Sequence, residues 1–254
     1  MYPSIPRLRT LIALIALLAA GAGFSLLRPD PPVPELHMSG RTMGTTYNVK
    51  YRPTQNAPAL KAMQTEVDAL LAEINHTMST YDPESELSRF NRLRTTDWVP
   101  ASASLRAVLK AALEIGTQSE GAFDITVGPL VNLWGFGPEF HPDRIPLEAD
   151  IAAARRRSGL DKVTLSEAQQ AIRKYRPDVF LDLSGIAKGY GVDRVAELMT
   201  ERGIEHYMVE IGGEIRVRGL KAHETPWRIA IEKPLPGERS VQTVLALSDI
   251  ALAT

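Results

Sequence analysis

One stretch, VFLDLSGIAKGYGVDRV at residues 179–195, restricts the fold more than any other part of the sequence. Residues 179–183 are apolar apart from one aspartate, a Ser-Gly pair interrupts the run, and residues 186–199 continue with the spacing of an amphipathic helix. This order predicts a strand, a tight turn and a helix. Free N–H groups and the positive dipole end at the start of a helix favour an anion. Lys188 lies in that first turn, where a cation is mildly unfavourable unless a negative group lies nearby. We therefore predict a bound phosphate there.

Two common phosphate-binding fingerprints do not match this stretch. Walker A requires four residues between its first glycine and Gly-Lys-Ser/Thr, whereas only two residues separate Gly185 from Lys188. The dinucleotide motif G-x-G-x-x-G could begin at Gly189, but Arg194 stands where its third glycine belongs. Taken alone, the stretch also fits a structural role in which Asp182 caps the helix and the glycines tighten the turn.

The composition is that of a globular protein without a general affinity for polyanions. The chain has 254 residues, 23% of them charged, and a formal net charge of -1, so we expect no nucleic-acid partner. The sequence contains no cysteine, which excludes disulfides, thiolate metal sites, a cysteine nucleophile and lipid attachment through cysteine. The histidines show no paired metal spacing. Any bound metal would need oxygen or histidine ligands.

The N-terminal segment has the pattern of an export signal. Two arginines precede an unbroken apolar run over residues 11–27, and a Pro-rich linker over residues 28–36 follows. This run is longer than a usual signal-peptide core and short for a membrane span, so residues 1–27 are expected to be either a signal peptide or an N-terminal membrane anchor. Since basic flanks stay in the cytoplasm, residues 37–254 are expected on the periplasmic side of the inner membrane, anchored or released.

Periodicity in the rest of the chain predicts an α+β fold. Spacings of three and four residues indicate helices over residues 58–78, 105–116 and 151–157, with a short helix capped by Ser85 or Ser88. Strands are expected at residues 47–51, 163–165, 207–211, 214–218, 227–231, 241–247 and 250–254. Gly212-Gly213 predicts a hairpin. Helices and strands do not alternate regularly, which favours mixed, largely antiparallel sheets with packed helices over a doubly wound sheet.

A second unusual segment, GAFDITVGPLVNLWGFG at residues 121–137, combines glycines and aromatic residues without a regular period. Such a loop either lines a ligand pocket or packs as a buried structural loop. Asp124 lies between apolar neighbours and needs a partner if it is buried. In the polar segment STYDPESELSRFN, at residues 79–91, Tyr81 could pack in the core or serve as a platform for a ligand ring.

Four segments together resemble one enzyme family. They are Met43-Gly44-Thr45, residues 79–91, residues 121–137, and residues 181–195 with the following Ile211-Gly212-Gly213. In this order and at these distances they resemble the FAD:protein FMN transferase family, the ApbE-like flavin transferases. The resemblance covers nearly all of residues 37–254, and two of its motifs are long and unusual in composition.

The resemblance implies an ApbE-like flavin transferase fold that holds FAD and Mg²⁺ in a cleft. The implied enzyme transfers the FMN moiety of FAD to a Ser or Thr hydroxyl of a target protein by a phosphoester bond and releases AMP. Asp182 and Lys188 are the implied catalytic residues, and the backbone carbonyl of Gly185 is the implied metal ligand. Carried over by position, the FAD contacts are Met43, Tyr81, Ala122, Phe123, Asp124, Asp182 and Lys188.

These residue types suit phosphoryl chemistry, which depends on charge neutralisation more than on covalent help from the protein. Lys188 and the turn amides could stabilise negative charge on the phosphate or on departing AMP. Asp182 could orient FAD or a metal-bound water. No protein nucleophile is needed, because the target protein brings its own hydroxyl.

Two features depart from the family pattern. The remaining metal ligands of the family come from an Asp-Pro-x-Thr-Gly segment, preceded by a histidine important for activity, whereas this sequence stops at Ala-Thr where the family usually continues with Ser-Gly. We therefore expect the domain at residues 37–254 to be incomplete at its C-terminus. Many relatives are attached to the membrane through a lipidated cysteine, which this sequence does not contain. Any membrane attachment would therefore be through the uncleaved segment 11–27.

Three functions remain open at the level of the sequence. The first is flavin transfer to a target protein, for which the resemblance implies subunits of membrane redox complexes or FMN-binding-domain proteins. The second is metal-dependent hydrolysis of FAD to FMN and AMP, since water and a target hydroxyl attack the same phosphorus. The third is a non-catalytic flavin-binding accessory protein.

Overall fold

The computed structural model describes residues 34–138, 145–235 and 240–253. The predicted signal or anchor segment, residues 1–27, and most of the Pro-rich linker lie outside these residues. The last linker residue, Leu36, is already the first residue of a strand. Within the described residues, every helix is too short or too polar to span a bilayer.

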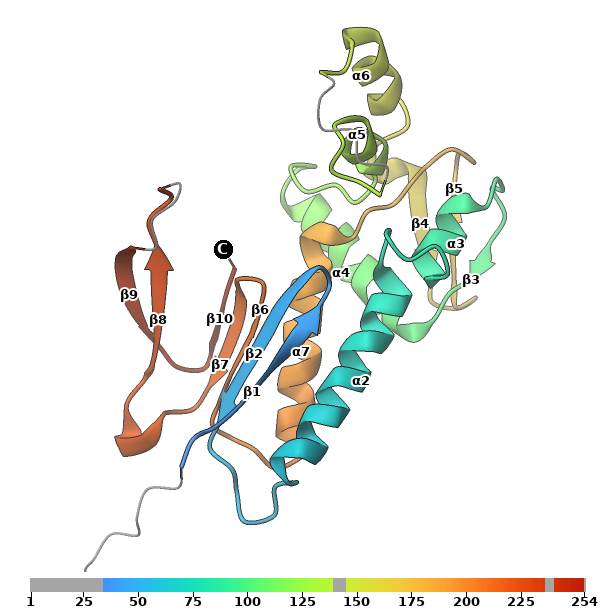
Figure 1. The fold of residues 1–254 in the computed structure, drawn as a ribbon. Coiled ribbons are helices and arrows are strands. Elements are labelled where there is room, and N and C mark those ends of the chain that lie inside the picture. The colour runs from blue at the N-terminus through green and yellow to red at the C-terminus, as the bar shows by residue number, and fades with distance from the viewer. Residues whose placement is uncertain (1–33, 139–144, 236–239, 254) are drawn as a thin grey trace, which may run out of the picture. The chain divides into compact units, whose positions relative to one another are not determined.

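The largest sheet is antiparallel and follows the strand order β1-β2-β6-β7-β10 (Figure 1). Its strands are β1 (Leu36–Thr42), β2 (Thr45–Tyr51), β6 (Tyr207–Ile211), β7 (Glu214–Arg218) and β10 (Ile250–Leu252). Alternation in β2 buries Tyr47, Val49 and Tyr51 on one face, because successive side chains of a strand point to opposite faces. The hairpin predicted at Gly212-Gly213 is confirmed by the pairing of β6 with β7.

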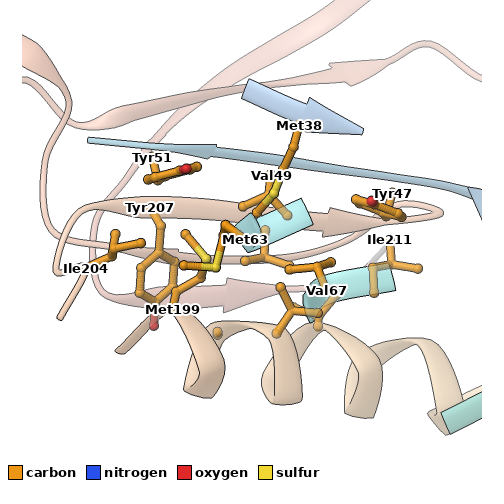
Figure 2. Packing of buried hydrophobic residues seen from close by; sticks show 14 of the residues in the cluster. Met38, Tyr47, Val49, Tyr51, Met63, Val67, Met199, Ile204, Tyr207 and Ile211 are labelled. Carbon is orange, nitrogen blue, oxygen red and sulfur yellow. The ribbon is translucent and has the colours of Figure 1, made fainter. Parts of the chain in front are cut away.

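Two long helices, α2 (Leu60–Met78) and α7 (Ser184–Glu201), pack against this face of the sheet. Figure 2 shows Val49 of β2, Met63 and Val67 of α2, and Met199 of α7 in one shared core. The apolar stripe of α2 recurs every three or four residues, so it forms one continuous buried face. This packing fixes the start of α7 beside the end of α2.

A second core lies around the segment that precedes α7. It joins α3 (Glu86–Arg92), α4 (Ala103–Gln118) and a small sheet of β3 (Val99–Pro100), β5 (Ala171–Lys174) and β4 (Val163–Ser166). Leu181 and Leu183 are fully buried in this core. Ser85 caps α3 by accepting a hydrogen bond from the Ser88 N–H, as predicted for one of the two candidate serines.

The hairpin of β8 (Trp227–Glu232) and β9 (Val241–Leu247) packs on the opposite face of the large sheet. Trp227 is buried there in one cluster with Ile215 and Val217. The remaining helices are α5 (Gly128–Leu133), α6 (Glu148–Arg155) and the short turns η1 (Leu160–Lys162) and η2 (Ala222–Glu224).

The predicted α+β class is confirmed, but one element was predicted wrongly. Residues 179–183, expected as a strand, pair with no other strand in the described part of the chain. The Leu181 backbone instead bonds to the side chain of Asn91, and the Asp182 N–H donates to the Ile125 carbonyl. A side chain and a loop have replaced the strand partner. The loop at residues 121–137 also contains the helix α5, which its sequence did not indicate.

Candidate functional site

A pocket of about 260 Å³ opens where the end of α2, the β1–β2 turn and the start of α7 meet. It contains three of the predicted FAD contacts, Met43, Tyr81 and Lys188, which are far apart in the sequence. Its other lining residues are Ile74, Asn75, Met78, Ser79, Thr80, Ser184 and Ala187. A larger cavity of about 550 Å³, between α7 and the strands β7 and β10, contains none of the predicted site residues.

Met43 reaches the pocket from the tight turn between β1 and β2. Its backbone is left-handed, with φ 48°, and the following Gly44 has φ 72°. A side chain on Gly191 would place its Cβ 3.2 Å from both Met43 Cε and Ile211 Cδ1. Glycine at position 191 therefore allows the β1–β2 turn to lie close against α7.

Lys188 is tied to the β6–β7 turn. Its Nζ donates to the Gly212 carbonyl at 3.1 Å and lies 3.5 Å from Glu214 Oε1. Glu214 supplies a negative group beside this lysine, a role that the sequence analysis assigned to a bound phosphate; the phosphate stays a prediction. One third of the Lys188 side chain remains exposed, so its charge is still accessible from the pocket.

Asp182 lies two residues before α7 and is 8% exposed. Its Oδ1 accepts a hydrogen bond from the Ser184 N–H at 2.8 Å, and Ser184 lines the pocket. The N-cap position itself belongs to Leu183, which has no side-chain cap. Asp182 therefore shapes the turn into α7, in part as the structural alternative predicted. Asp182 itself does not line the pocket, whereas its hydrogen-bond partner Ser184 does.

The predicted metal ligand Gly185 lies in the first turn of α7, under the ring of Phe123. A Cβ at position 185 would be 3.1 Å from Phe123 Cε2, so this close approach favours glycine. Phe123 belongs to the loop at residues 121–137, which is thereby placed against the start of α7. No residue of this loop lines the 260 Å³ pocket, so the contact places the loop against α7 and does not bear out the pocket-lining interpretation.

Asp124 is half-buried and has the partner that its burial requires. Its Oδ1 accepts from both the N–H and the hydroxyl of Thr126 at 2.7 Å, and the Thr126 hydroxyl accepts from the Gly159 N–H at 2.5 Å. These bonds order the loop. The predicted contacts Ala122 and Asp124 do not line the pocket, and the Ala122 N–H donates to the Ser119 carbonyl.

Tyr81 lies on the surface rather than in the core. The side chain is 64% exposed, and its hydroxyl donates to the Phe136 carbonyl at 2.7 Å. Of the two predicted roles for this aromatic ring, the position favours a platform for a ligand. The hydrogen bond also joins two of the four motif segments directly.

Two polar residues that the sequence did not single out organise the segment at residues 79–91. The Ser79 carbonyl accepts hydrogen bonds from the hydroxyls of Ser85 and Ser88, while its own hydroxyl accepts from the backbone of Tyr81. Asn91 bonds to the backbone of Leu181. The available signal was their place inside an unusual polar motif, but their partners are distant in sequence.

The described residues do not assemble a magnesium site by themselves. Across residues 34–138, 145–235 and 240–253, no three His, Cys, Asp or Glu side chains lie together as a metal-binding group. Mg²⁺ prefers six oxygen ligands in near-octahedral geometry. The Gly185 carbonyl and the nearby Asp182 carboxylate fall short of that number, so no chemical step is assigned to the metal here.

Comparison with known proteins shows the family of the chain. The model of the ApbE family matches residues 43–254. The FAD:protein FMN transferase of Vibrio cholerae serotype O1 is 48% identical over 225 residues, covering 89% of this chain and 67% of the relative. The FAD:protein FMN transferase of Haemophilus influenzae is 42% identical over 243 residues, covering 94% and 70% of the two chains.

Solved structures show the same fold. The flavin transferase ApbE from Vibrio cholerae superposes with a TM-score of 0.81 at 48% identity, covering 87% of this chain and 71% of that chain. The apo form of the flavinyl transferase ApbE from Pseudomonas stutzeri superposes with a TM-score of 0.79 at 35% identity, covering 87% and 69%.

Proposed function

This chain belongs to the ApbE family of FAD:protein FMN transferases, and from that premise we propose which of its residues act in flavin transfer and where the protein works. It is a transferase that acts on FAD and flavinylates protein. The observation that supports a site at the start of α7 is the meeting of Met43, Tyr81 and Lys188 around one pocket.

In the proposed reaction a Ser or Thr hydroxyl of the target attacks the FMN-side phosphorus of FAD. A new P–O bond joins FMN to the target, the bond from that phosphorus to the oxygen of AMP breaks, and the hydroxyl proton passes to a base or to solvent. Lys188 would stabilise the negative charge that develops on the phosphate and on departing AMP. Asp182 would orient the diphosphate or accept the proton, from a position fixed by Ser184.

Magnesium dependence is part of this proposal. The Gly185 carbonyl is the ligand that this part of the chain would contribute. The matching test is removal of divalent ions with EDTA followed by readdition of Mg²⁺, with flavin transfer as the readout. Loss and recovery of transfer would support the proposal, and full activity in EDTA would contradict it.

The decisive assay for the transferase uses the purified protein with FAD, Mg²⁺ and a candidate target domain. A covalent mass increase on the target equal to FMN, with one AMP released for each adduct, is the expected result. Release of AMP without an adduct would identify the hydrolase instead. Formation of neither product would contradict both enzymatic functions and favour a flavin-binding accessory protein.

We further propose that the protein works at the periplasmic side of the inner membrane. The support is the basic start and apolar run of residues 1–27, which is the pattern of a signal peptide or anchor. Its targets would be subunits of membrane redox complexes or proteins with an FMN-binding domain. A reporter enzyme that is active only after export, fused after residue 254, tests the location. An inactive reporter in cells that produce the fusion at full level would contradict it.

A further inference from the structure

The segment that carries Asp182 crosses the second core without a neighbouring strand. Leu181 is 0% exposed, so its backbone N–H and carbonyl need partners inside the protein. Both partners belong to one side chain. Leu181 N donates to Asn91 Oδ1 at 2.8 Å, and Asn91 Nδ2 donates to the Leu181 carbonyl at 2.8 Å. The amide of Asn91 thus replaces a strand partner at this residue.

Asn91 is itself held firmly in place. It lies near the end of α3 and is 5% exposed. The buried Lys174 donates to the carbonyl of Leu93 at 2.7 Å and lies 3.3 Å and 3.4 Å from the carbonyl oxygens of Phe90 and Asn91. These contacts fix the last turn of α3 on β5, so Asn91 offers its amide from a rigid support.

The next residue after Leu181 is Asp182, and its position follows from this clamp. The Asp182 N–H donates to the Ile125 carbonyl at 2.8 Å, and its carboxylate accepts from Ser184, which lines the pocket. Because the two residues are adjacent, a shift of the Leu181 backbone would move the Asp182 carboxylate by a similar amount. Asn91 does not line the pocket, so it can influence the reaction only through the residues it holds.

We propose that Asn91 is a positioning residue for flavin transfer: its two hydrogen bonds to Leu181 set the position of Asp182 at the start of α7. This inference rests on the role proposed above for Asp182. A displacement of about 1 Å in a reacting group can lower a rate by about 100-fold. The loss in an Asn91 variant should therefore fall on kcat for FMN transfer rather than on the KM for FAD.

The first test compares Asn91→Leu, which has a similar volume and no hydrogen-bonding groups, with a matched core variant. Leu109→Ala removes buried apolar volume from the same core on α4, and Leu109 neither lines the pocket nor bonds to the Leu181 backbone. We expect Asn91→Leu to lower kcat by about 10- to 100-fold, whereas Leu109→Ala lowers the melting temperature and leaves kcat within about twofold. Equal kcat losses at equal melting temperatures would overturn the proposal, because Asn91 would then contribute only stability.

Hydrogen exchange gives a readout that does not depend on activity. In Asn91→Leu the amides of residues 179–184 should exchange faster than in the unmodified protein, while Leu109→Ala should not single out this segment. Unchanged protection of residues 179–184 in Asn91→Leu would show that the clamp does not hold the segment. If Asn91→Leu does not fold, Asn91→Asp serves in its place, because it keeps the size and the acceptor for Leu181 N.

A double variant separates this inference from the role of Asp182. If Asn91 acts through Asp182, Asn91→Leu combined with Asp182→Asn should be no slower than Asp182→Asn alone. Multiplied losses would show that Asn91 acts by another route. An active Asp182→Asn would contradict the role proposed for Asp182, whereas an inactive Asp182→Asn beside a fully active Asn91→Leu would contradict only the positioning role.

Discussion

Two regions beside the pocket are built in different ways. One is residues 181–184, called the floor, of which Ser184 lines the pocket; the other is Tyr81, which lines the pocket, with Phe136, called the rim. Leu181, Asp182 and Leu183 of the floor are buried, whereas Ser184 is exposed, and side-chain or loop hydrogen bonds fix both Leu181 and Asp182. In the rim, Tyr81 and Phe136 are 64% and 74% exposed and share one hydrogen bond. Fixed charges suit transition-state stabilisation, whereas exposed rings suit contacts with arriving substrates. Floor substitutions should therefore change kcat, and rim substitutions should change KM.

The largest effect is expected at Asp182 in the floor. Asp182→Asn keeps an oxygen that can accept from Ser184 N–H but removes the charge and the proton acceptor. We expect kcat for FMN transfer to fall by about 100- to 10,000-fold, the range of general acid–base contributions, with little change in melting temperature. Mass spectrometry of the flavinylated target measures the rate. A variant that unfolds more easily but transfers FMN at the normal rate would leave Asp182 with a structural role alone.

Lys188 should give the next largest loss. Lys188→Met removes the positive charge, and we expect kcat to fall by about 100- to 1000-fold, as for loss of one preorganised donor. Glu214→Gln is the informative companion, since Glu214 is the charged partner of Lys188. If the ion pair only holds the Lys188 side chain in place before substrate binds, Glu214→Gln should retain FMN transfer. A loss as large as that of Lys188→Met would instead assign Glu214 a part in the reaction.

Lys174 holds the end of α3, which carries Asn91, and its titration should make the free energy of unfolding depend on pH. This lysine is 1% exposed, and burial lowers its pKa to about 8, with the nearby Arg94 acting in the same direction and Asp178 opposing it. Between pH 8 and the ordinary lysine pKa of about 10.4, the unfolded chain binds more protons at this residue than the folded one. The free energy of unfolding therefore rises with pH over this window through Lys174.

Chemical denaturation at pH 8 and pH 10.4 checks this statement with Lys174→Met as the reference, because other groups titrate equally in both proteins. From pH 8 to pH 10.4, the free energy of unfolding of the unmodified protein should rise by up to about 3 kcal/mol more than that of Lys174→Met. A difference that stays constant, or that shrinks as pH rises, would mean that the folded protein holds Lys174 with an ordinary or raised pKa.

The smallest effect is expected in the rim. Tyr81→Phe keeps the ring and removes the hydrogen bond to the Phe136 carbonyl. An exposed hydrogen bond contributes about 1 kcal/mol, so the KM for FAD or for the target should rise a few-fold while kcat stays unchanged. Steady-state kinetics with each substrate varied in turn provides the measurement. A fall in kcat with KM unaltered would erase the distinction between rim and floor.

The elements with a clear period were predictable from the sequence. The stripe of α2, the alternation in β2 and the Gly212-Gly213 hairpin each depend on neighbours within a few residues, so local spacing is sufficient. The short strands β3 and β5 were missed because two to four residues carry too little pattern. The error at residues 179–183 has another cause: buried apolar residues favour a strand unless a distant side chain supplies the hydrogen bonds, as Asn91 does.

The family, the α+β class and the residue types of the site follow from the sequence alone, because contiguous motifs and local spacing carry them. The fold was needed to show that Met43, Tyr81 and Lys188 share a pocket, that Glu214 pairs with Lys188, and that the other predicted FAD contacts lie outside the pocket lining: Ala122, Phe123, Asp124 and Asp182. It also decided that Asn91 holds the backbone before Asp182. Hydrogen bonds and ion pairs depend on distance in space, and residues such as Asn91 and Leu181, 90 positions apart, meet only after the chain has folded.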